Sequence, residues 1–384
     1  MNLNRTRDAV LTLIGAAALL AYVLACTSFS PDDRKVLFPA FEAATGAVAV
    51  AVYDRDNGST TKLMALPSDG NLFRAVWSDD GRRVIVLSGM KQLRLTVLPF
   101  KTTEPVRLLE LPSDAEGFPN LIMSPAIVGS RLLLCVKTKL TSIDMETGAV
   151  KTNDVGSELL LLGHPRGVFY LRPVDPKTDG KEDEYEIGRV DASNLTCVPP
   201  FRVPSPASSN KFEPFFAVSP DTRRVALLAN HDGQQSFYIF EDQKLARTIP
   251  AALPTDSLLV MHPRFSLDGR TLYATFIRKA SNPAKEETAH QAGILEVPLD
   301  GAPSRQVPLF TVSDNSNLEA ANGFQLDVSH DGKTLAVCST FLKEALKPED
   351  LALYFVDLTR ADRKVTKIPI AAPPKPTAAS VPAK

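Results

Sequence analysis

Three of the five histidines in this 384-residue chain are spaced so that they could act together. His231, His262 and His290 fall in segments that we expect to be loops on one face of a repetitive fold. Imidazoles on a common face could bind a metal ion or transfer protons, because histidine ligates metals and titrates near neutral pH. The sequence gives no distance between the three rings. They are therefore weak metal-site candidates, and we assign no catalytic residue and no cofactor.

An acidic stretch partly fits a twelve-residue calcium-binding loop. Positions 1, 5, 6, 9 and 12 of such a loop would be Asp175, Asp179, Gly180, Asp183 and Glu186. Lys177 stands at position 3, where the loop requires an oxygen ligand, and both flanks read as strands. A solvated acidic hairpin is the better interpretation.

The sequence lacks the common catalytic and cofactor-binding motifs. It contains no G-x-S-x-G, H-E-x-x-H or G-x-G-x-x-G pattern. Residues 208–211 formally match S-x-x-K, but they lie among prolines instead of opening a helix, so we treat the match as chance.

A repeated turn shows which elements must position any site. The stretches VWSDDGRRVIVL, FAVSPDTRRVALL, FSLDGRTLYATF and DVSHDGKTLAV are close copies of one another. Their serines, Ser78, Ser219, Ser266 and Ser329, are 141, 47 and 63 residues apart, and 141 is three times 47. Eroded copies at Ser124 and His164 fill the first interval, which gives six units.

The motif reads as a turn between the first and second strands of each unit. Ser and Asp side chains can accept backbone N–H bonds that a turn leaves unpaired, and Gly can adopt the left-handed position that closes it. A structural role is therefore sufficient for Ser78, Asp80, Gly81, Ser219, Asp221, Ser266, Asp268, Gly269, Ser329, Asp331 and Gly332.

Four strands in each unit, with a period of 40 to 50 residues, predict an all-β chain folded as a β-propeller of four-stranded antiparallel blades. Residues 36–370 accommodate seven blades of about 47 residues, and six is the alternative. Residues 27–35 would be a linker. Residues 371–384 are rich in Pro and Ala and would form a disordered tail.

The units FAVSPDTRRVALLA, PRFSLDGRTLYATF and LDVSHDGKTLAVCS, each followed by a strand like LYFVDL, resemble TolB-type, WD-like propeller repeats of exported bacterial proteins. The resemblance covers residues 36–370. It implies a periplasmic scaffold or binding module without fixing one partner.

The N-terminus has the parts of an export signal. Arg5 and Arg7 precede seventeen uncharged residues, 9–25, and Cys26 ends the stretch. VLAC, residues 23–26, resembles the bacterial lipobox, which implies lipidation of Cys26. An uncleaved membrane anchor and an ordinary cleaved signal are the alternatives. All three place the body on the periplasmic or cell-surface side, and we favour the lipoprotein.

The balance of charged residues limits the kinds of partner that we expect. The chain has 43 Lys plus Arg and 44 Asp plus Glu, so it has no net basic field to hold a nucleic acid. We expect an exported, membrane-tethered propeller that binds an envelope protein or peptide, through the loops opposite the repeated turns. A propeller hydrolase or lactonase-type enzyme at the channel mouth is the alternative, and it requires His231, His262 and His290 to cluster.

Overall fold

The fold is known from a computed structural model, which describes the residues given next. The described residues are 27–41, 48–66, 71–89, 93–100, 107–111, 125–136, 138–157, 159–174, 184–204, 215–231, 234–251, 259–280, 289–313, 325–339 and 351–370. The predicted tail, 371–384, lies outside them, as does Cys26.

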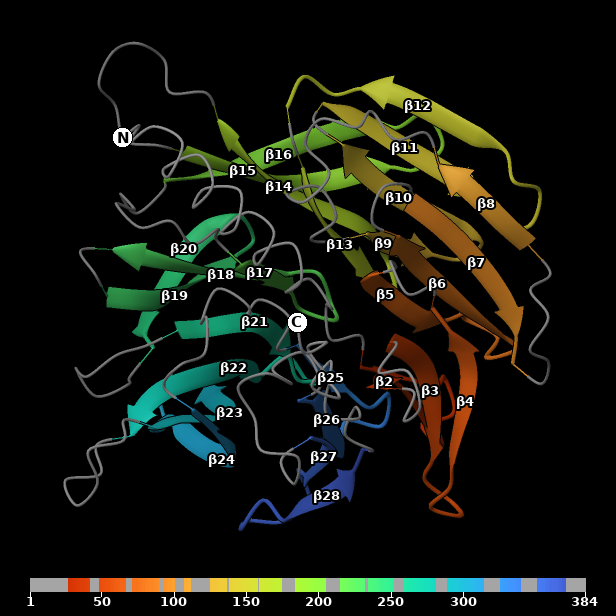
Figure 1. Cartoon of the computed structure of the whole chain (residues 1–384). Coiled ribbons are helices and arrows are strands. Elements are labelled where there is room, and N and C mark those ends of the chain that lie inside the picture. Colours follow the sequence, from red (N-terminus) through yellow and green to blue (C-terminus); the bar gives the residue numbers. More distant parts are fainter. Residues whose placement is uncertain are drawn as a thin grey trace, which may run out of the picture.

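These residues form seven four-stranded antiparallel sheets, which are arranged as blades around a ring (Figure 1). Each blade consists of four strands that are consecutive in the chain, and no described residue is helical. The chain is a seven-bladed β-propeller. The predicted fold class and the favoured blade number are confirmed, and the six-blade alternative is wrong.

The first four blades take sixteen strands. Blade 1 is β1 (Ser28–Phe29), β2 (Lys35–Phe41), β3 (Val48–Asp54) and β4 (Thr60–Ala65); blade 2 is β5 (Asn71–Trp77), β6 (Arg83–Gly89), β7 (Leu93–Pro99) and β8 (Arg107–Leu111). Blade 3 is β9 (Ala126–Val128), β10 (Arg131–Val136), β11 (Lys139–Asp144) and β12 (Val150–Asp154); blade 4 is β13 (Leu160–His164), β14 (Gly167–Val174), β15 (Glu184–Asp191) and β16 (Thr196–Pro204).

The last three blades contain the remaining twelve strands. Blade 5 is β17 (Phe215–Val218), β18 (Arg224–His231), β19 (Gln234–Glu241) and β20 (Lys244–Pro250); blade 6 is β21 (Leu259–Phe265), β22 (Thr271–Ala280), β23 (Ala289–Pro298) and β24 (Arg305–Ser313). Blade 7 is β25 (Leu326–Val328), β26 (Thr334–Cys338), β27 (Ala352–Asp357) and β28 (Val365–Pro369).

The repeated motif forms the turn between the first and second strands of its blade. In blade 2, the Ser78 hydroxyl accepts a hydrogen bond from Arg83 N–H (3.0 Å) and donates one to Asp80 Oδ1 (2.6 Å), which also accepts from Arg82 N–H (3.0 Å). This serine bond lowers the pKa of the Asp80 carboxyl. The same set of bonds recurs in the turns that begin at Ser219, Ser266 and Ser329.

The start of the propeller lies earlier than the sequence suggested. Residues 27–35, expected to be a linker, contain β1 and a seventh copy of the turn. Ser30 accepts from Lys35 N–H (2.9 Å) and donates to Asp32 (2.6 Å). The heptad SPDDRKV at 30–36 parallels SPDTRRV at 219–225, and Ser30 is 48 residues before Ser78 (78 − 30). This copy of the turn is complete. Because β1, the strand before it, is only two residues long, the sequence shows no alternating strand pattern there.

The two eroded copies differ from each other. In blade 3 the turn between β9 and β10 falls at Gly129 and Ser130, so the proposed equivalence of Ser124 is wrong; Ser124 itself lies outside the described residues. In blade 4, His164 ends β13 and its Nδ1 accepts from Arg166 N–H (3.1 Å). In this turn an imidazole nitrogen therefore accepts the backbone hydrogen bond that an aspartate carboxylate accepts in the repeated turns.

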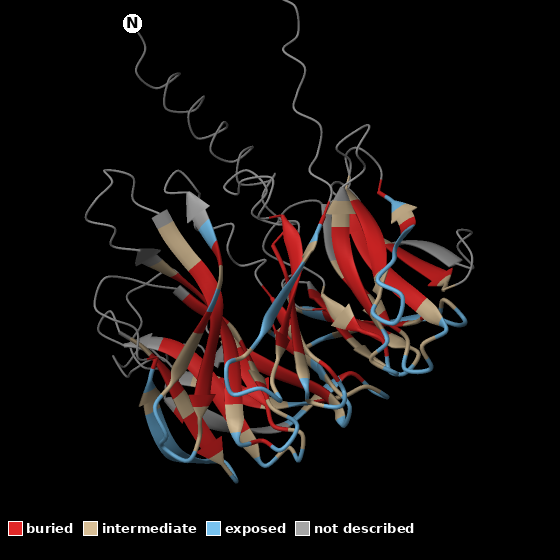
Figure 2. Ribbon diagram, turned by 90° about the horizontal axis from the view of Figure 1, so that it is seen from below, coloured by how far each residue is buried: buried red, intermediate tan, exposed pale blue. Residues whose placement is uncertain are grey.

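Among the described residues, the hydrophobic core is divided into seven clusters, one between each pair of adjacent blades. The second strand of a blade is buried on both faces. In β6, Val84 and Val86 pack toward blade 1, whereas Ile85 and Leu87 pack toward blade 3. The alternation follows from the two-residue period of a strand. Figure 2 shows these buried strands above the exposed turns.

The ring closes between blade 7 and blade 1 through side chains. Each blade is built from one continuous stretch, so among the described strands none from one end of the chain completes the sheet of the other. The contact is a buried cluster of Phe29, Val36, Phe38 and Ala51 with Ala336, Cys338, Leu353, Phe355 and Ile370. The Phe355 ring lies 6.4 Å from that of Phe29 and 5.6 Å from that of Tyr53, between ring centroids.

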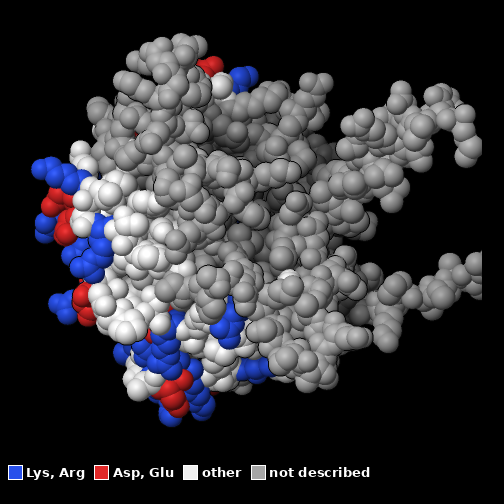
Figure 3. All heavy atoms as spheres, turned by 90° about the vertical axis from the view of Figure 1, so that its left-hand side faces the viewer, with Lys and Arg blue, Asp and Glu red and all other residues white. Residues whose placement is uncertain are grey.

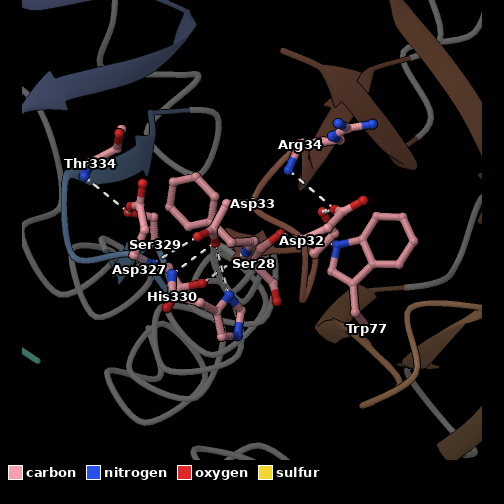
Figure 4. A network of polar contacts seen from close by, with 12 residues as sticks. Ser28, Asp32, Asp33, Arg34, Trp77, Asp327, Ser329, His330 and Thr334 are labelled. Atoms are coloured by element: carbon pink, nitrogen blue, oxygen red, sulfur yellow. Dashed lines mark hydrogen bonds and ion pairs between the residues drawn. The ribbon is translucent and has the colours of Figure 1, made fainter. Parts of the chain in front are cut away.

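Near the repeated turns, a carboxylate of blade 1 also binds blade 7 (Figure 4). The Asp33 carboxylate accepts from the backbone N–H groups of His330 (2.7 Å) and Asp331 (2.8 Å), and lies 2.9 Å from His330 Nδ1. Asp33 has a left-handed backbone (φ 58°), which the equivalent turns give to Gly81 (φ 66°) or Thr222 (φ 64°). Asp33 thus keeps an unfavourable backbone conformation and uses its side chain to join two blades.

The turns of blades 1 and 5 provide a matched pair of substitutions. A non-glycine residue in the left-handed region costs about 1–2 kcal/mol, partly offset by the greater unfolded-state freedom of glycine, about 0.4–1 kcal/mol. Thr222→Gly should therefore raise the free energy of unfolding by about 0.5–1 kcal/mol in urea titrations. Asp33→Gly relieves the same strain but removes the closure bonds, so it should lower stability by about 1–3 kcal/mol. Equal stabilisation by both variants would contradict a closure role for Asp33.

Candidate functional site

The three histidines lie in strands and not in the loops where we expected them. His231 ends β18, His262 lies within β21, and His290 is the second residue of β23. His262 and His290 are on the first and third strands of one blade, which separates them by two strand spacings, about 10 Å. His290 pairs with Lys279, and Met261, which precedes His262, pairs with Thr275. The two histidines are therefore also offset by more than about 13 Å along the sheet.

This geometry does not provide the cluster that the enzyme alternative requires. The His262 ring packs against Phe215, with ring centroids 4.5 Å apart. The His231 side chain lies outside the described atoms. Within the described part of the chain, no three His, Cys, Asp or Glu side chains are placed to hold a metal ion.

Glu186, the last member of the calcium-loop pattern, is engaged elsewhere. It is buried on β15, accepts a hydrogen bond from the Tyr170 hydroxyl (2.7 Å) and pairs with the Arg172 guanidinium (2.5 Å). Burial and this bond raise the pKa of Tyr170. The strand flanks agree with a hairpin, but Glu186 is not solvated as we expected. The other four positions, within 175–183, lie outside the described residues.

The described surface has a small pocket between two turns, and on one side of the molecule its charges are mixed. A pocket of about 160 Å³ lies between the turns of blades 2 and 3, where Arg83 and Glu146 approach to 3.7 Å. It is smaller than typical ligand pockets of about 300–1,000 Å³. On the side drawn in Figure 3, basic and acidic side chains intermingle, and Arg223 pairs with Asp242 at 2.9 Å.

Three charged residues belong to the innermost strands of their blades. Arg74 belongs to β5, Arg264 to β21 and Asp327 to β25, which are the first strands of blades 2, 6 and 7, and Gln325 precedes β25. Figure 1 shows these strands around the centre of the ring. Arg74 Nη1 donates to Gln325 Oε1 (3.1 Å), a contact that reaches from blade 2 past blade 1 to blade 7. We call these four residues the axial cluster.

Electrostatics link the members of the axial cluster. The pKa of Arg264 falls to about 10 because the guanidinium is buried and lies near Arg74, an effect that Asp327 opposes. The pKa of Asp327 is raised by burial, although the Phe29 N–H bond (2.9 Å) and Arg264 both favour its charged form. The cluster thus holds two guanidinium groups against one carboxylate.

Sequence reasoning missed this cluster, although a signal was present. Counted back from the turn serine, Arg264 and Asp327 stand two residues before Ser266 and Ser329, and Arg74 stands four before Ser78. The innermost strands of blades 2, 6 and 7 thus carry charged residues. The innermost strand of blade 5, β17 (FFAV), has only apolar residues. Aligning the copies by their first strands, and not only by their turns, would have placed these residues near one axis.

Comparisons with known proteins reveal the fold. No protein-family model matches the sequence, and no curated protein is significantly similar to it. A chain of the mitotic checkpoint complex aligns with a TM-score of 0.53 and 14% identity, over 84% of this chain and 88% of that one. A chain from the complex of KlAtg21 with the coiled-coil of AgAtg16 gives 0.54 and 12%, over 90% and 99%. The Dos1 propeller gives 0.49 and 10%, over 82% and 89%.

The chain shares the β-propeller fold with these structures. At such low identities the likeness concerns the fold alone, so any site in this propeller has to be argued from its own residues. Its N-terminal 26 residues lie outside the described part, and within that part no helix has the length and apolar character to cross a bilayer.

The Glu186 pair can be tested against an exposed pair of the same type. Glu186→Gln leaves the Arg172 charge partly buried without its partner, so it should lower the free energy of unfolding by about 2 kcal/mol or more. Glu146→Gln, whose side chain is 61% exposed beside Arg83, should change it by less than about 0.5 kcal/mol. Urea unfolding with and without calcium chloride measures both effects. Stabilisation of the wild type by calcium, lost in Glu186→Gln, would restore the calcium-loop interpretation.

Proposed function

We propose that this propeller is an exported, membrane-tethered binding module of the bacterial envelope, of the TolB type, whose partner is a protein or peptide. The observation that carries the binding role is the closed ring of seven four-stranded blades. Export and tethering rest on the N-terminal pattern of Arg5, Arg7, the uncharged stretch 9–25 and Cys26.

The fold is consistent with this role. A closed ring of blades holds its loops on a rigid frame, and loops on such frames commonly bind other molecules. The similar structures named above include a checkpoint complex and a complex with a coiled-coil, so chains with this fold occur in assemblies with other proteins. The enzyme alternative receives no support from the positions of His262 and His290.

The tether predicts a defined N-terminus. When the full chain is produced in a bacterial host, mass spectrometry of the purified protein should show a chain that begins at Cys26 and carries a lipid. Cys26→Ser should abolish the lipid mass and release the protein from membranes. An unmodified Cys26 in a chain that retains Met1 would contradict lipidation and favour an uncleaved anchor. Cleavage without lipid would indicate an ordinary signal.

Binding on the face opposite the repeated turns predicts face-specific crosslinking. A photoreactive amino acid at Ala280, the last residue of β22, should crosslink an envelope protein or peptide when the chain is mixed with envelope extract. The same group at Leu267, which is 48% exposed in a repeated turn, should not. Equal products from both positions, or products from Leu267 alone, would contradict the proposed face.

A further inference from the structure

The turn between β9 and β10 of blade 3 is shorter than the repeated turns. Val128 pairs with Arg131, so only residues 129 and 130 separate the two strands. In blade 6, by contrast, Phe265 pairs with Leu272, and residues 266–271 form the turn. A Cβ atom placed on Gly129 would have no neighbouring atom within 4 Å. Blade 3 thus lacks most of the turn segment, and the space beside its short turn is open.

The short turn changes the contact that Arg83 of blade 2 makes with the next blade. Arg224 stands at the same distance after its turn serine, and its Nη1 donates to the carbonyl oxygen of Gly269 in the next turn (3.0 Å). Blade 3 has no turn of this kind. The Arg83 guanidinium instead approaches the Glu146 carboxylate to 3.7 Å, and both side chains are partly exposed. An ion pair at the surface therefore takes the place of a bond to a turn.

The pocket of about 160 Å³ occupies this place between blades 2 and 3. Its buried lining is Ile85, Val97 and Met145, which belong to the apolar cluster between the two blades. Its more exposed lining comes from the turns and consists of Ser78, Asp79, Asp80, Arg83, Gly129, Ser130 and Glu146. Pockets for drug-sized ligands measure about 300–1,000 Å³. This pocket therefore suits a single side chain, with an apolar floor and a polar rim.

The charges of the rim are mainly negative. Asp79, Asp80 and Glu146 are acidic, and Arg83 is the one basic residue of the described lining. The bond from the Ser78 hydroxyl lowers the pKa of the Asp80 carboxyl, so this group is ionised at neutral pH. The Asp79 carboxylate has no hydrogen bond or ion pair within the described part of the chain. Residues 101–106, which connect β7 to β8 outside the described part, include one Lys and one Glu and leave the balance unchanged.

An alkylammonium group fits both parts of this pocket. The methylene groups of a lysine side chain pack on apolar surface while the ammonium remains among polar groups. Carboxylates at the rim attract the ammonium, and they repel an anion. A metal ion is a poorer occupant, because no three of the described His, Cys, Asp or Glu side chains are placed to hold one.

We propose that this pocket binds a lysine side chain of a protein partner, with the stem on Ile85, Val97 and Met145 and the ammonium beside Asp79 and Glu146. The site lies at the turn end of the ring, opposite the loops that the proposed function assigns to binding. It goes beyond that function and depends on neither export nor lipidation. The turn of blade 6 that contains Leu267 is separated from blades 2 and 3 by two blades on either side, so a failed crosslink there leaves this site untouched.

The first test compares peptides that differ only in the head group of one side chain. Acetylated, amidated pentapeptides with a central Lys, Nε-acetyllysine or Glu are titrated into the full chain in detergent and followed by calorimetry. We expect saturable binding of the Lys peptide, binding of the acetyllysine peptide at least tenfold weaker, and none of the Glu peptide. Added salt should weaken the binding, because it screens charges at an exposed rim.

Two outcomes of this titration would overturn the proposal. Equal affinity for the Lys and acetyllysine peptides would show that the ammonium is not recognised. Binding of n-butylammonium, a side-chain analogue, without binding of the Lys peptide would indicate a site for small amines and would overturn the assignment to a protein partner.

Variants then assign the site. The double variant Asp79→Asn/Glu146→Gln should weaken binding of the Lys peptide at least tenfold, since each exposed charge pair contributes up to about 1 kcal/mol. Arg83→Gln should tighten it about threefold, because the competing cation is removed. A matched double variant, Asp56→Asn/Asp242→Asn, removes two exposed carboxylates that are paired with arginine elsewhere, and it should bind like the wild type.

The directions of these changes decide the assignment. Unchanged affinity in the folded Asp79→Asn/Glu146→Gln variant, or weaker binding in folded Arg83→Gln, would overturn it. An equal loss in the Asp56→Asn/Asp242→Asn variant would also overturn it, because attraction would then come from the overall charge. Circular dichroism establishes that each variant is folded.

Carbodiimide coupling locates the bound ammonium. The reagent activates a carboxylate, and an amine displaces the resulting urea to form an amide. Glu146, Asp242 and Asp56 are equally exposed (61%, 62% and 60%), and each lies beside an arginine. Relative to coupling of glycinamide, which has no aliphatic stem, the Lys peptide should couple to Glu146 at least threefold more than to the other two. Equal ratios at all three positions, read by peptide mapping, would contradict a pocket for lysine.

Discussion

The contact between blade 7 and blade 1 is the constraint on which the rest of this molecule depends. The other blades pack against neighbours to which they are joined by the chain, whereas these two meet only because the ring returns to its start. No sheet of the described strands spans the two blades, so the apolar cluster around Phe29 and Phe355 and the carboxylate of Asp33 hold the ring closed. If this contact opens, the remaining six interfaces lose the geometry that makes a ring.

The axial cluster is coupled to the same contact. Asp327 bonds the backbone of Phe29 in blade 1, and it acts electrostatically on Arg264 in blade 6. Gln325, two residues earlier, bonds Arg74 in blade 2. One short segment of blade 7 therefore contributes both to closure and to the charged group at the axis. A change that loosens closure would also displace Asp327 and Gln325.

Much of the fold could be predicted from the sequence, and little of the site. The turns are specified locally, by serine, aspartate and a left-handed residue within six positions, so their repetition reveals the blades and their number. Blade 1 was missed in part because Ser28–Phe29 is too short to show a strand pattern, although the Ser30 turn was complete. The axial cluster depends on residues about 250 positions apart, such as Arg74 and Gln325, and local patterns do not reveal that they meet.

The order of the blades along the chain has a consequence for how the protein is made. Most contacts form between residues of one blade or its neighbour, whereas the bond between Phe29 and Asp327 spans 298 residues. Local contacts form before distant ones, because closing a long loop costs more conformational entropy. During synthesis the ring remains an open arc until β25–β28 emerge, with one apolar blade face uncovered at each end. Assembly of the axial cluster is therefore a late event, and the exposed ends of the arc are where a chaperone or an aberrant partner would act.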